Sequence, residues 1–262
     1  MNQSINHNIK PYHSERKRRI WPRNPEFFTP LYLVFALFVI TCFIAHNSYA
    51  ETGSGGLWQR LKDMPEPREQ HGFEALNGIL YVVCGQSAPR THKRDVYAYN
   101  INTNTWTTKA PAPIALQSPV LRAVNGKLYL IGGYDSTIPL KYDTTFEYDP
   151  AADAWTRKAN MPTAREDMAS AVVDGRIYIF AGITNPGLEI TAAVEVYDPV
   201  TDTWQFKTKM PNPRCLGDFG CAYNGTVYLV SGTDNLEGYG STLFPGTRVD
   251  QYQPSDLSLI HI

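Results

Sequence analysis

The sequence lacks the residue patterns of metal, redox and nucleotide sites. Its 262 residues include only four cysteines and six histidines, and no two cysteines have the CxxC spacing of a zinc or thiol–disulfide motif. It contains no P-loop, nucleophile elbow or zinc spacing. The formal net charge is −1, so no basic face for nucleic acid is expected. We therefore expect no metal, no cofactor, no catalytic residue of these classes and no nucleic-acid partner.

Long apolar runs are also scarce, and the one that stands out lies near the N-terminus. It spans residues 31–45, follows a basic stretch over residues 10–19 and precedes Ser48-Tyr49-Ala50. This order is typical of a secretory signal peptide cleaved after small residues. An uncleaved signal anchor over residues 27–46 is the alternative, because Phe27 and Phe28 lengthen the apolar span toward the ~20 residues of a membrane helix.

These observations divide the N-terminal part of the chain. We predict a basic leader with a signal peptide or signal anchor over residues 1–50 and a linker over residues 51–57. The remainder is expected to be extracytoplasmic, either periplasmic or secreted, with membrane contact only through an uncleaved leader.

What the chain has in plenty is a repeated pattern. Trp58, Trp106, Trp155 and Trp204 are separated by 48, 49 and 49 residues. Tyrosines recur with the same period at Tyr81, Tyr129, Tyr178 and Tyr228, and again at Tyr99, Tyr148 and Tyr197. Several residue types repeating in step indicate tandem structural units.

Each unit has the turn and strand signals of a small antiparallel sheet. Asn-Gly or Asp-Gly pairs at positions 77, 125, 174 and 224 predict two-residue hairpins, because both central residues need positive φ. A short apolar run without polar alternation follows each pair, which predicts a strand buried on both faces. Each run leads to a glycine where close backbone approach is expected: Gly85, Gly133, Gly182 and Gly232. A third strand and the tryptophan strand complete four strands per unit.

The residues of these units resemble the kelch repeat. The third unit matches its pattern well, with Ala164-Arg165, Asp174-Gly175, Tyr178, Gly182, Tyr197-Asp198-Pro199, Trp204 and Met210-Pro211. Leu116 stands where the second unit would have its arginine. The resemblance implies an all-β fold, a β-propeller in which each repeat is one four-stranded blade. It covers residues 58–256, with repeats near 67–110, 113–159, 164–208 and 213–256.

The fourth repeat breaks the pattern near the end of the sequence. Leu259 stands where a tryptophan is expected, and residues 257–262 read as the translation of a sequencing-library adapter. We expect these six residues to be a non-native tail and the four blades to be a truncated part of a larger propeller. The alternative is that the strand around Trp58 completes the fourth repeat and closes a ring of four blades, which is the lower limit for propellers.

Loops that connect strands on one face of the propeller form the candidate ligand-binding face. A ring of equivalent arginines could bind carboxylates of a peptide or an acidic sugar, and Tyr134 and Tyr239 lie outside the repeat period as surface aromatics. The candidate residues are Arg68, Gln70, His71, Arg90, His92, Tyr134, Arg165, Asp167, Arg214, Asp218, Asn235 and Tyr239.

A structural role for the arginines is the alternative. Each would then pair with a carboxylate such as Glu69, Glu166 or Asp218 and fix the blade edge. The periodic tryptophans and tyrosines are expected in the core, because they recur with the structural period. The cysteines at positions 84, 215 and 221 are expected to be small buried residues, with a Cys84–Cys221 disulfide as the alternative if the first and last blades meet.

Two functions from different classes remain open. The first is an extracytoplasmic binding module that recognises a protein, peptide or glycan through the interblade and post-glycine loops. The second is a fragment of a carbohydrate-active enzyme, either galactose oxidase-like or sialic acid epimerase-like. His71 and His92 are too few for a histidine-rich copper site, whereas Arg165, Glu166 and Asp167 could serve an acidic sugar.

Overall fold

The computed structural model describes residues 58–88, 91–185, 188–215, 220–234 and 249–254. The chain divides into two units, Met1–Arg60 and Leu61–Ile262. The predicted leader, linker, anchor segment and tail lie outside the described residues. Of the predicted ligand-binding residues, Arg90, Asp218, Asn235 and Tyr239 lie outside them as well. Within the described ranges no helix is long and apolar enough to span a membrane.

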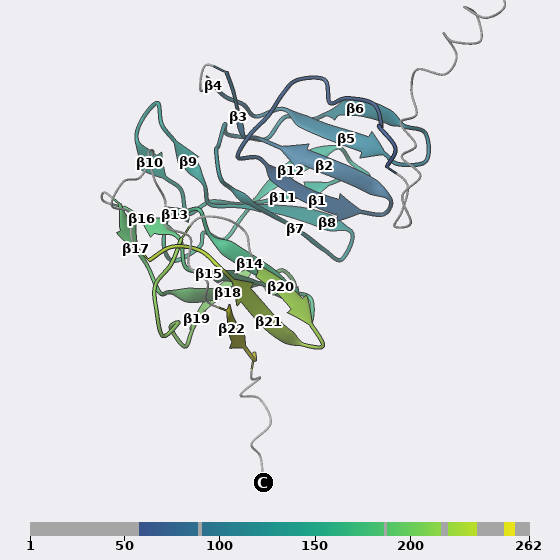
Figure 1. The fold of residues 1–262 in the computed structure, drawn as a ribbon. Helices are drawn as coiled ribbons and strands as arrows, with labels where there is room; N and C mark the ends of the chain where they lie inside the picture. The colour runs from purple at the N-terminus through teal and green to yellow at the C-terminus, as the bar shows by residue number, and fades with distance from the viewer. Residues whose placement is uncertain (1–57, 89–90, 186–187, 216–219, 235–248, 255–262) are drawn as a thin grey trace, which may run out of the picture. The chain divides into compact units, whose positions relative to one another are not determined.

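The second unit is a series of antiparallel sheets, which we number as blades 1 to 4 along the chain (Figure 1). Blade 1 consists of β1 (Gly72–Leu76), β2 (Ile79–Val83), β5 (Val96–Asn100) and β6 (Thr105–Lys109). Blade 2 consists of β7 (Val120–Val124), β8 (Lys127–Ile131), β11 (Thr145–Asp149) and β12 (Ala154–Lys158). Blade 3 consists of β14 (Ala169–Val173), β15 (Arg176–Phe180), β18 (Val194–Asp198) and β19 (Thr203–Lys207). Blade 4 has three described strands, β20 (Gly220–Tyr223), β21 (Thr226–Val230) and β22 (Val249–Tyr252).

Short strands extend from the blades at their glycine ends. The hairpins β3 (Gln86–Ser87) with β4 (Thr91–His92), β9 (Tyr134–Asp135) with β10 (Leu140–Lys141), and β16 (Ile183–Thr184) with β17 (Glu189–Ile190) follow the glycines of blades 1, 2 and 3. In blade 3 the segment β13 (Arg165–Glu166) adds to this small sheet. The chain is therefore all-β with four-stranded antiparallel units, as the sequence predicts.

The hairpin turns and the glycines have the backbone conformations that the sequence predicts. Asn125 and Gly126 both have positive φ, 50° and 78°, and the equivalent pairs of the other blades share this conformation. At Gly182, where φ is 100°, a Cβ atom on the glycine would lie 2.6 Å from the Glu166 carbonyl oxygen. The chain entering the blade thus passes directly over the glycine, which leaves no room for a side chain.

Hydrophobic contacts between successive blades form the core. The first strands β1, β7, β14 and β20 lie against one another in this order, and each of three apolar clusters joins two neighbouring blades. The runs in blades 2 and 3 are buried on both faces, as predicted. In blade 4 the prediction is wrong for Val230, which is exposed because no described residue covers that side of the sheet.

A repeated polar contact connects each outer strand to the end of the preceding outer strand. The Nε1 atoms of Trp155 and Trp204 donate hydrogen bonds of 3.0 Å to the carbonyl oxygens of Ala110 and Ala159. Trp106 makes the same contact with Lys62. Each tryptophan ring also tilts against the tyrosine seven residues before it. Trp155 and Trp204 therefore occupy equivalent environments between blades, and Trp106 makes the same contact with the segment that precedes blade 1.

A residue with a left-handed backbone conformation adds further hydrogen bonds to this contact between outer strands. Asp153 has a φ of 49° and accepts hydrogen bonds from the Tyr148 hydroxyl and the Ala110 amide. These two donors hold the pKa of Asp153 below its ordinary value. Asn104 and Asp202 accept the equivalent pairs of hydrogen bonds in blades 1 and 3. Trp58 differs from the other periodic tryptophans, because it lies outside any strand and is exposed.

Substitution of Trp155 by Phe is expected to destabilise the protein by about 1–3 kcal/mol, because the Ala110 carbonyl loses its donor between two blades. Urea unfolding followed by circular dichroism measures this loss. Trp58→Phe is the matched control and should change the free energy of unfolding by less than about 0.5 kcal/mol. Equal losses for the two variants would contradict the structural role of the hydrogen bond.

Candidate functional site

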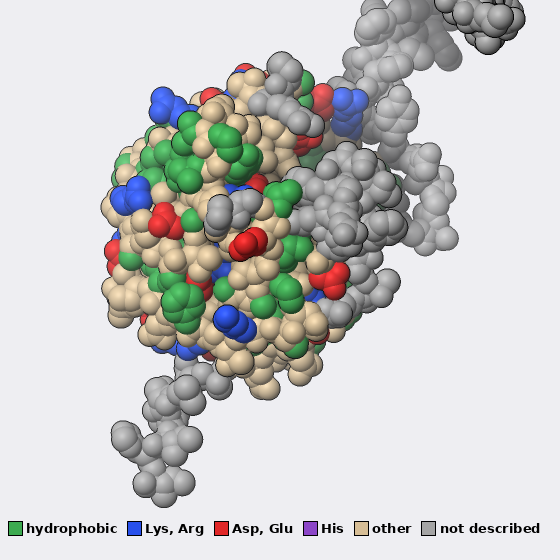
Figure 2. Space-filling view, turned by 90° about the vertical axis from the view of Figure 1, so that its left-hand side faces the viewer, with side chains coloured by type: hydrophobic (Ala, Val, Ile, Leu, Met, Phe, Trp, Pro, Cys, Tyr) green, Lys and Arg blue, Asp and Glu red, His purple; other side chains and the backbone are tan. Residues whose placement is uncertain are grey.

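The small hairpins and the turns that enter each blade lie on one side of the blades, which we call the loop side. It includes β3–β4, β9–β10 and β16–β17, and the entering turns contact the hairpins through backbone hydrogen bonds such as Gln117 N to Tyr134 O at 2.9 Å. Figure 2 faces the part of this side that carries β9–β10 and β16–β17. Basic and acidic side chains are interspersed there among apolar ones, so the described surface in this view carries no continuous patch of one charge.

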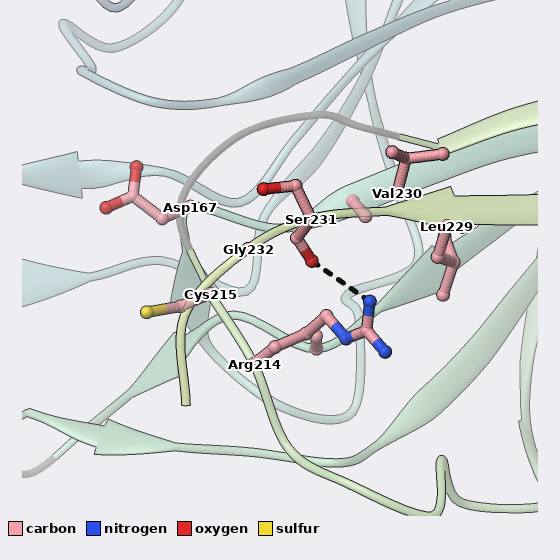
Figure 3. A pocket seen from close by; sticks show the side chains of 9 residues that line it. Asp167, Arg214, Cys215, Leu229, Val230, Ser231 and Gly232 are labelled. Carbon is pink, nitrogen blue, oxygen red and sulfur yellow. Dashed lines mark hydrogen bonds between the residues drawn. The ribbon is translucent and has the colours of Figure 1, made fainter. Parts of the chain in front are cut away.

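The three equivalent arginines point into the blades. Their Nη1 atoms donate to the carbonyl oxygens of Cys84, Ala181 and Ser231, each of which precedes a repeat glycine and has positive φ. The side chains of Arg68 and Arg165 have no exposed surface, and that of Arg214 has almost none. Figure 3 shows the Arg214 contact. The predicted arginine ring is therefore buried, and it does not present guanidinium groups to a ligand.

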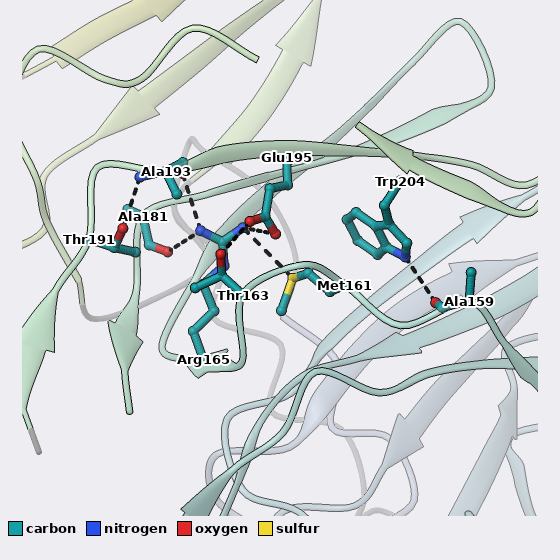
Figure 4. A network of polar contacts seen from close by, with 9 residues as sticks. All are labelled: Ala159, Met161, Thr163, Arg165, Ala181, Thr191, Ala193, Glu195 and Trp204. Carbon is teal, nitrogen blue, oxygen red and sulfur yellow. Dashed lines mark hydrogen bonds and ion pairs between the residues drawn. The ribbon is translucent and has the colours of Figure 1, made fainter. Parts of the chain in front are cut away.

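Arg165 illustrates how completely such a guanidinium is held (Figure 4). Its Nη1 atom donates to the carbonyl oxygens of Ala181 and Ala193, both at 3.2 Å, and its Nη2 atom lies 2.9 Å from Glu195 Oε2. The other oxygen of Glu195 accepts a hydrogen bond from the Thr163 hydroxyl. Burial lowers the pKa of Arg165 to about 10, so the group remains charged near neutral pH.

The arginines pair with carboxylates, as the structural alternative predicts, but the partners differ from the expected ones. Arg165 pairs with Glu195 instead of Glu166, and Arg214 pairs with Asp250. Arg68 lies near Glu66 and Asp95. The expected partner Glu166 was wrong, because the Arg165 guanidinium is directed into the blade and reaches Glu195 on the third strand. The expected partner Asp218 lies outside the described residues.

Blade 2 contains an apolar version of the same pair. Leu116 stands at the arginine position, and Phe146 stands at the position of Glu195, the second residue of the third strand. Both are buried in the same apolar cluster. The arginine and its carboxylate are thus replaced together, which agrees with the rule that a buried ion pair can be exchanged for well-packed apolar residues. The ion pair is therefore not required by the fold itself.

Arg165→Leu alone is expected to destabilise the protein by about 3–5 kcal/mol, because Glu195 is left charged and buried. The double variant Arg165→Leu/Glu195→Phe copies blade 2 and should recover most of the loss. Urea unfolding of both variants measures this, with Arg94→Leu at an exposed position as control. A double variant as unstable as the single one would refute the equivalence of the two blades.

His92 connects blades 1 and 2 on the loop side. Its Nε2 atom lies 3.0 Å from Gln117 Oε1 and 3.1 Å from the Ser136 hydroxyl, and its Nδ1 atom lies 3.3 Å from Asp135 Oδ1. The imidazole side chain is almost fully buried. Since both ring nitrogens face oxygen atoms of blade 2 or its entering turn, His92 holds two hairpins together and is not directed at solvent.

Glu166 and Lys141 form a second buried polar contact, between blades 2 and 3. Lys141 Nζ lies 3.9 Å from Glu166 Oε1 and 5.4 Å from the centre of the Tyr134 ring. Glu166 Oε2 is buried without a hydrogen-bond partner. Burial first, and then the nearby charge of Asp167, raise the pKa of Glu166 to about 7, although Lys141 opposes the shift. Glu166 is therefore a carboxyl group that titrates near neutrality.

Glu166 should make stability depend on pH in a definite direction. The native protein holds this proton more tightly than the unfolded chain, so the contribution is fully present below pH about 4.5 and is lost as the pH rises to about 7. Glu166→Gln should flatten this part of the curve of unfolding free energy against pH. Glu189→Gln, an exposed carboxylate on β17, should keep the wild-type slope. A wild-type slope in Glu166→Gln would rule out the assignment.

One side chain ties the hairpins of blades 2 and 3 together. The Asn185 side chain accepts a hydrogen bond from the Lys141 amide at 3.4 Å and donates one to the Lys141 carbonyl at 2.9 Å. On the same two hairpins, Ile138 and Leu140 of one and Leu188 of the other are exposed. Large apolar side chains are thus presented to solvent by two hairpins that are held in register.

A small pocket lies beside the entry to blade 4 (Figure 3). Asp167, Cys215 and Gly232 contribute to its lining, together with apolar residues of β21. Burial raises the pKa of the Cys215 thiol to about 12, with Asp167 adding to the shift, so this cysteine stays protonated. The pocket therefore contains no activated thiol nucleophile.

The remaining predicted residues are distributed over the loop side. Gln70 is exposed and bonds to the Gln86 side chain, and His71 is half-buried with a pKa lowered by burial and by Arg68. Tyr134 and Asp167 are half-buried. The sequence interpretation missed Gln117, Lys141 and the exposed tip residues. Only the tips carried a usable signal, namely apolar residues in a turn-rich segment.

The described part of the chain shows the state of three cysteines and can be searched for metal-binding groups. Cys84, Cys215 and Cys221 are free. Cys84 and Cys215 are buried as expected, whereas the expectation is wrong for Cys221, which is exposed. The alternative Cys84–Cys221 disulfide is therefore not formed. Among the described residues, no group of three histidine, cysteine or carboxylate side chains is arranged to hold a metal ion.

Comparison with known proteins agrees with this architecture. The model of the kelch motif matches residues 67–113, 119–162 and 164–211. The solved structure of YjhT superimposes with a TM-score of 0.64 at 21% sequence identity, covering 77% of this chain and 73% of that chain. At this identity the likeness shows the fold alone. The chain is a kelch-repeat protein with the propeller fold and belongs to the family of the kelch motif.

Curated relatives match shorter parts of the chain. Kelch-like protein terF of Aspergillus terreus is 30% identical over 113 residues, which are 38% of this chain and 25% of that protein. Kelch-like protein 35 of Mus musculus is 37% identical over 76 residues, 29% of this chain and 13% of that protein. The N-(sulfonatooxy)prop-2-enimidothioate sulfolyase of Thlaspi arvense is 29% identical over 106 residues, 36% of this chain and 29% of that protein. The chain thus spans less than a third of the length of these relatives.

Proposed function

We propose that this chain is an extracytoplasmic kelch-propeller binding module that recognises a protein or peptide through its loop side. The observation that carries the proposal is the exposure of Ile138, Leu140 and Leu188 on two hairpins tied by Asn185. Neighbouring exposed apolar side chains on a fixed scaffold are typical of protein interaction sites. The extracytoplasmic location rests on the basic leader and the apolar run over residues 31–45.

The buried groups favour a protein or peptide over a glycan or an acidic ligand. The arginines that would bind carboxylates of a ligand are buried in the blades, where they pair with carboxylates of this chain. The indole N–H groups of Trp155 and Trp204 bond to the preceding blade and are not available to a glycan. What the described loop side offers to a partner is mainly the apolar tips, with Gln70, Tyr134 and Asp167 as polar neighbours. Burial of two leucine side chains in a complex would contribute about 1.5–3 kcal/mol each.

A sugar-active enzyme of the sialic acid epimerase type is the second candidate, and Glu166 favours it. A carboxyl group with a pKa of about 7 is suited to general acid–base catalysis at neutral pH. The kelch relative from Thlaspi arvense is a lyase by its name, so enzymes occur among the relatives. Loss of turnover of an acidic sugar in Glu166→Gln, with Leu140→Ser unaffected, would favour this candidate.

Selection of ligands for the purified chain tests the binding module. Peptides chosen from a displayed library and glycans on an array are measured against the wild type and against Leu140→Ser/Leu188→Ser. We expect peptide ligands whose dissociation constants rise more than about tenfold in the double variant. Val200→Ser, which changes an exposed apolar residue in the turn before β19, should bind like the wild type. Ligands that bind both variants equally would reject the loop tips as the site.

A further inference from the structure

A serine, a histidine and an aspartate meet where the hairpins of blades 1 and 2 come together. The Ser136 hydroxyl oxygen lies 3.1 Å from Nε2 of His92, and Nδ1 of His92 lies 3.3 Å from Oδ1 of Asp135. Contacts of this length connect nucleophile, base and orienting group in many enzymes before substrate binds. The order of hydroxyl, imidazole and carboxylate is that of a serine hydrolase triad, which is recognised by geometry and not by sequence spacing.

The repeat shows that the fold does not dictate these residue types. At the junction of blades 2 and 3, Lys141 stands at the position of His92. Asn185 stands at the position of Ser136, and its side chain bonds to the Lys141 backbone. Two hairpins are therefore joined there without an imidazole or a hydroxyl group. The need to join hairpins does not explain why the junction of blades 1 and 2 has a serine on a histidine.

The surroundings of His92 place its ring proton for this role. The amide and hydroxyl of Thr137 both donate to Asp135 Oδ1, at 2.8 and 2.6 Å. Burial opposes the ionisation of Asp135, but the hydrogen bonds from Thr137 and the contact with His92 outweigh it and lower the pKa of Asp135. An ionised carboxylate at Nδ1 is a stronger acceptor than the Gln117 side-chain amide at Nε2. With the proton on Nδ1, Nε2 accepts the Ser136 hydroxyl hydrogen, and the Gln117 amide turns its nitrogen toward the ring.

The hydroxyl is open to solvent, whereas its base is not. Ser136 is exposed in the turn between β9 and β10, and the His92 side chain is only 2% exposed. The large apolar residues Ile138 and Leu140, two and four positions after Ser136 on the same hairpin, are exposed as well. A substrate with an apolar group therefore finds apolar side chains on the hairpin that carries the serine.

We propose that Ser136, His92 and Asp135 form an esterase site for carboxylic esters with an apolar acyl group. Ser136 Oγ bonds to the ester carbonyl carbon while its proton passes to Nε2 of His92. The bond to the alcohol oxygen then breaks, and His92 returns the proton to that oxygen. Water repeats the two steps on the acyl-serine, which releases the carboxylic acid and restores the hydroxyl. Ser136 and His92 are the catalytic residues, and Asp135 is a positioning residue that orients the ring.

Labelling with a fluorophosphonate probe, which bonds covalently to activated serines, tests the site in the purified full-length chain. We expect the intact mass to increase by one probe per chain, peptide mapping to locate the probe at Ser136, and the chain to hydrolyse p-nitrophenyl butyrate. Ser136→Ala should lose labelling and hydrolysis. Ser87→Ala, which removes a hydroxyl group from the β3–β4 hairpin on the same loop side, is the control and should keep both.

Two further variants separate catalysis from a structural contact. His92→Gln keeps hydrogen-bonding groups in the junction but cannot carry the proton, so the labelling rate and kcat should fall at least about a hundredfold. Asp135→Asn keeps an oxygen for Thr137 and loses the charge, so kcat should fall at least about tenfold with little change in KM. Urea unfolding checks that both variants are folded. Ser136→Ala should bind peptides like the wild type, which keeps this test separate from that of the proposed function.

Three results would overturn the proposal. A wild-type chain that neither takes up the probe nor hydrolyses the ester would show that the three residues only join the hairpins. A probe attached to a residue other than Ser136 would place the activity elsewhere. Wild-type rates in folded His92→Gln would exclude the histidine as the base.

Discussion

The packing of each blade on its neighbours is the constraint on which the rest of the structure depends. A four-stranded sheet with short apolar strands has two sides to bury, and only the adjacent sheets can cover them. The apolar clusters follow this rule, since each joins one blade to the next. Strand order, hairpin position and the direction of the loops all follow from stacking the same unit repeatedly.

Buried polar contacts determine how accurately the units stack. The tryptophan N–H groups and the residues at positions 104, 153 and 202 fix the end of one outer strand against the next. On the loop side, Arg68, Arg165 and Arg214 hold the carbonyl group before the repeat glycine of blades 1, 3 and 4. A buried guanidinium is costly unless it is paired, so its presence under the glycine turn orients the hairpin that follows.

The sequence predicts the fold well, because the fold depends on residues with a strong preference for one backbone conformation or for a buried position. Asn-Gly turns, glycines under close backbone contact and periodic aromatic residues each have one physical explanation, and together they define the blade. The site is less accessible to such reasoning. That Arg165 faces Glu195 and not Glu166 depends on the direction of the side chain, and the meeting of Lys141 with Glu166 depends on two hairpins from different blades. Sequence spacing carries neither piece of information.

Comparison between repeats distinguishes residues that the fold requires from residues that it can replace. Leu116 with Phe146 takes the place of Arg165 with Glu195, so the ion pair cannot be the reason for the fold. Exposed apolar residues on the β9–β10 and β16–β17 tips have no such scaffold role, and they lie away from the sides through which blades stack. The contacts of Gln117 with His92 and of Asn185 with Lys141 keep successive hairpins on one side, so the scaffold fixes the position of these hairpins without using their exposed apolar side chains.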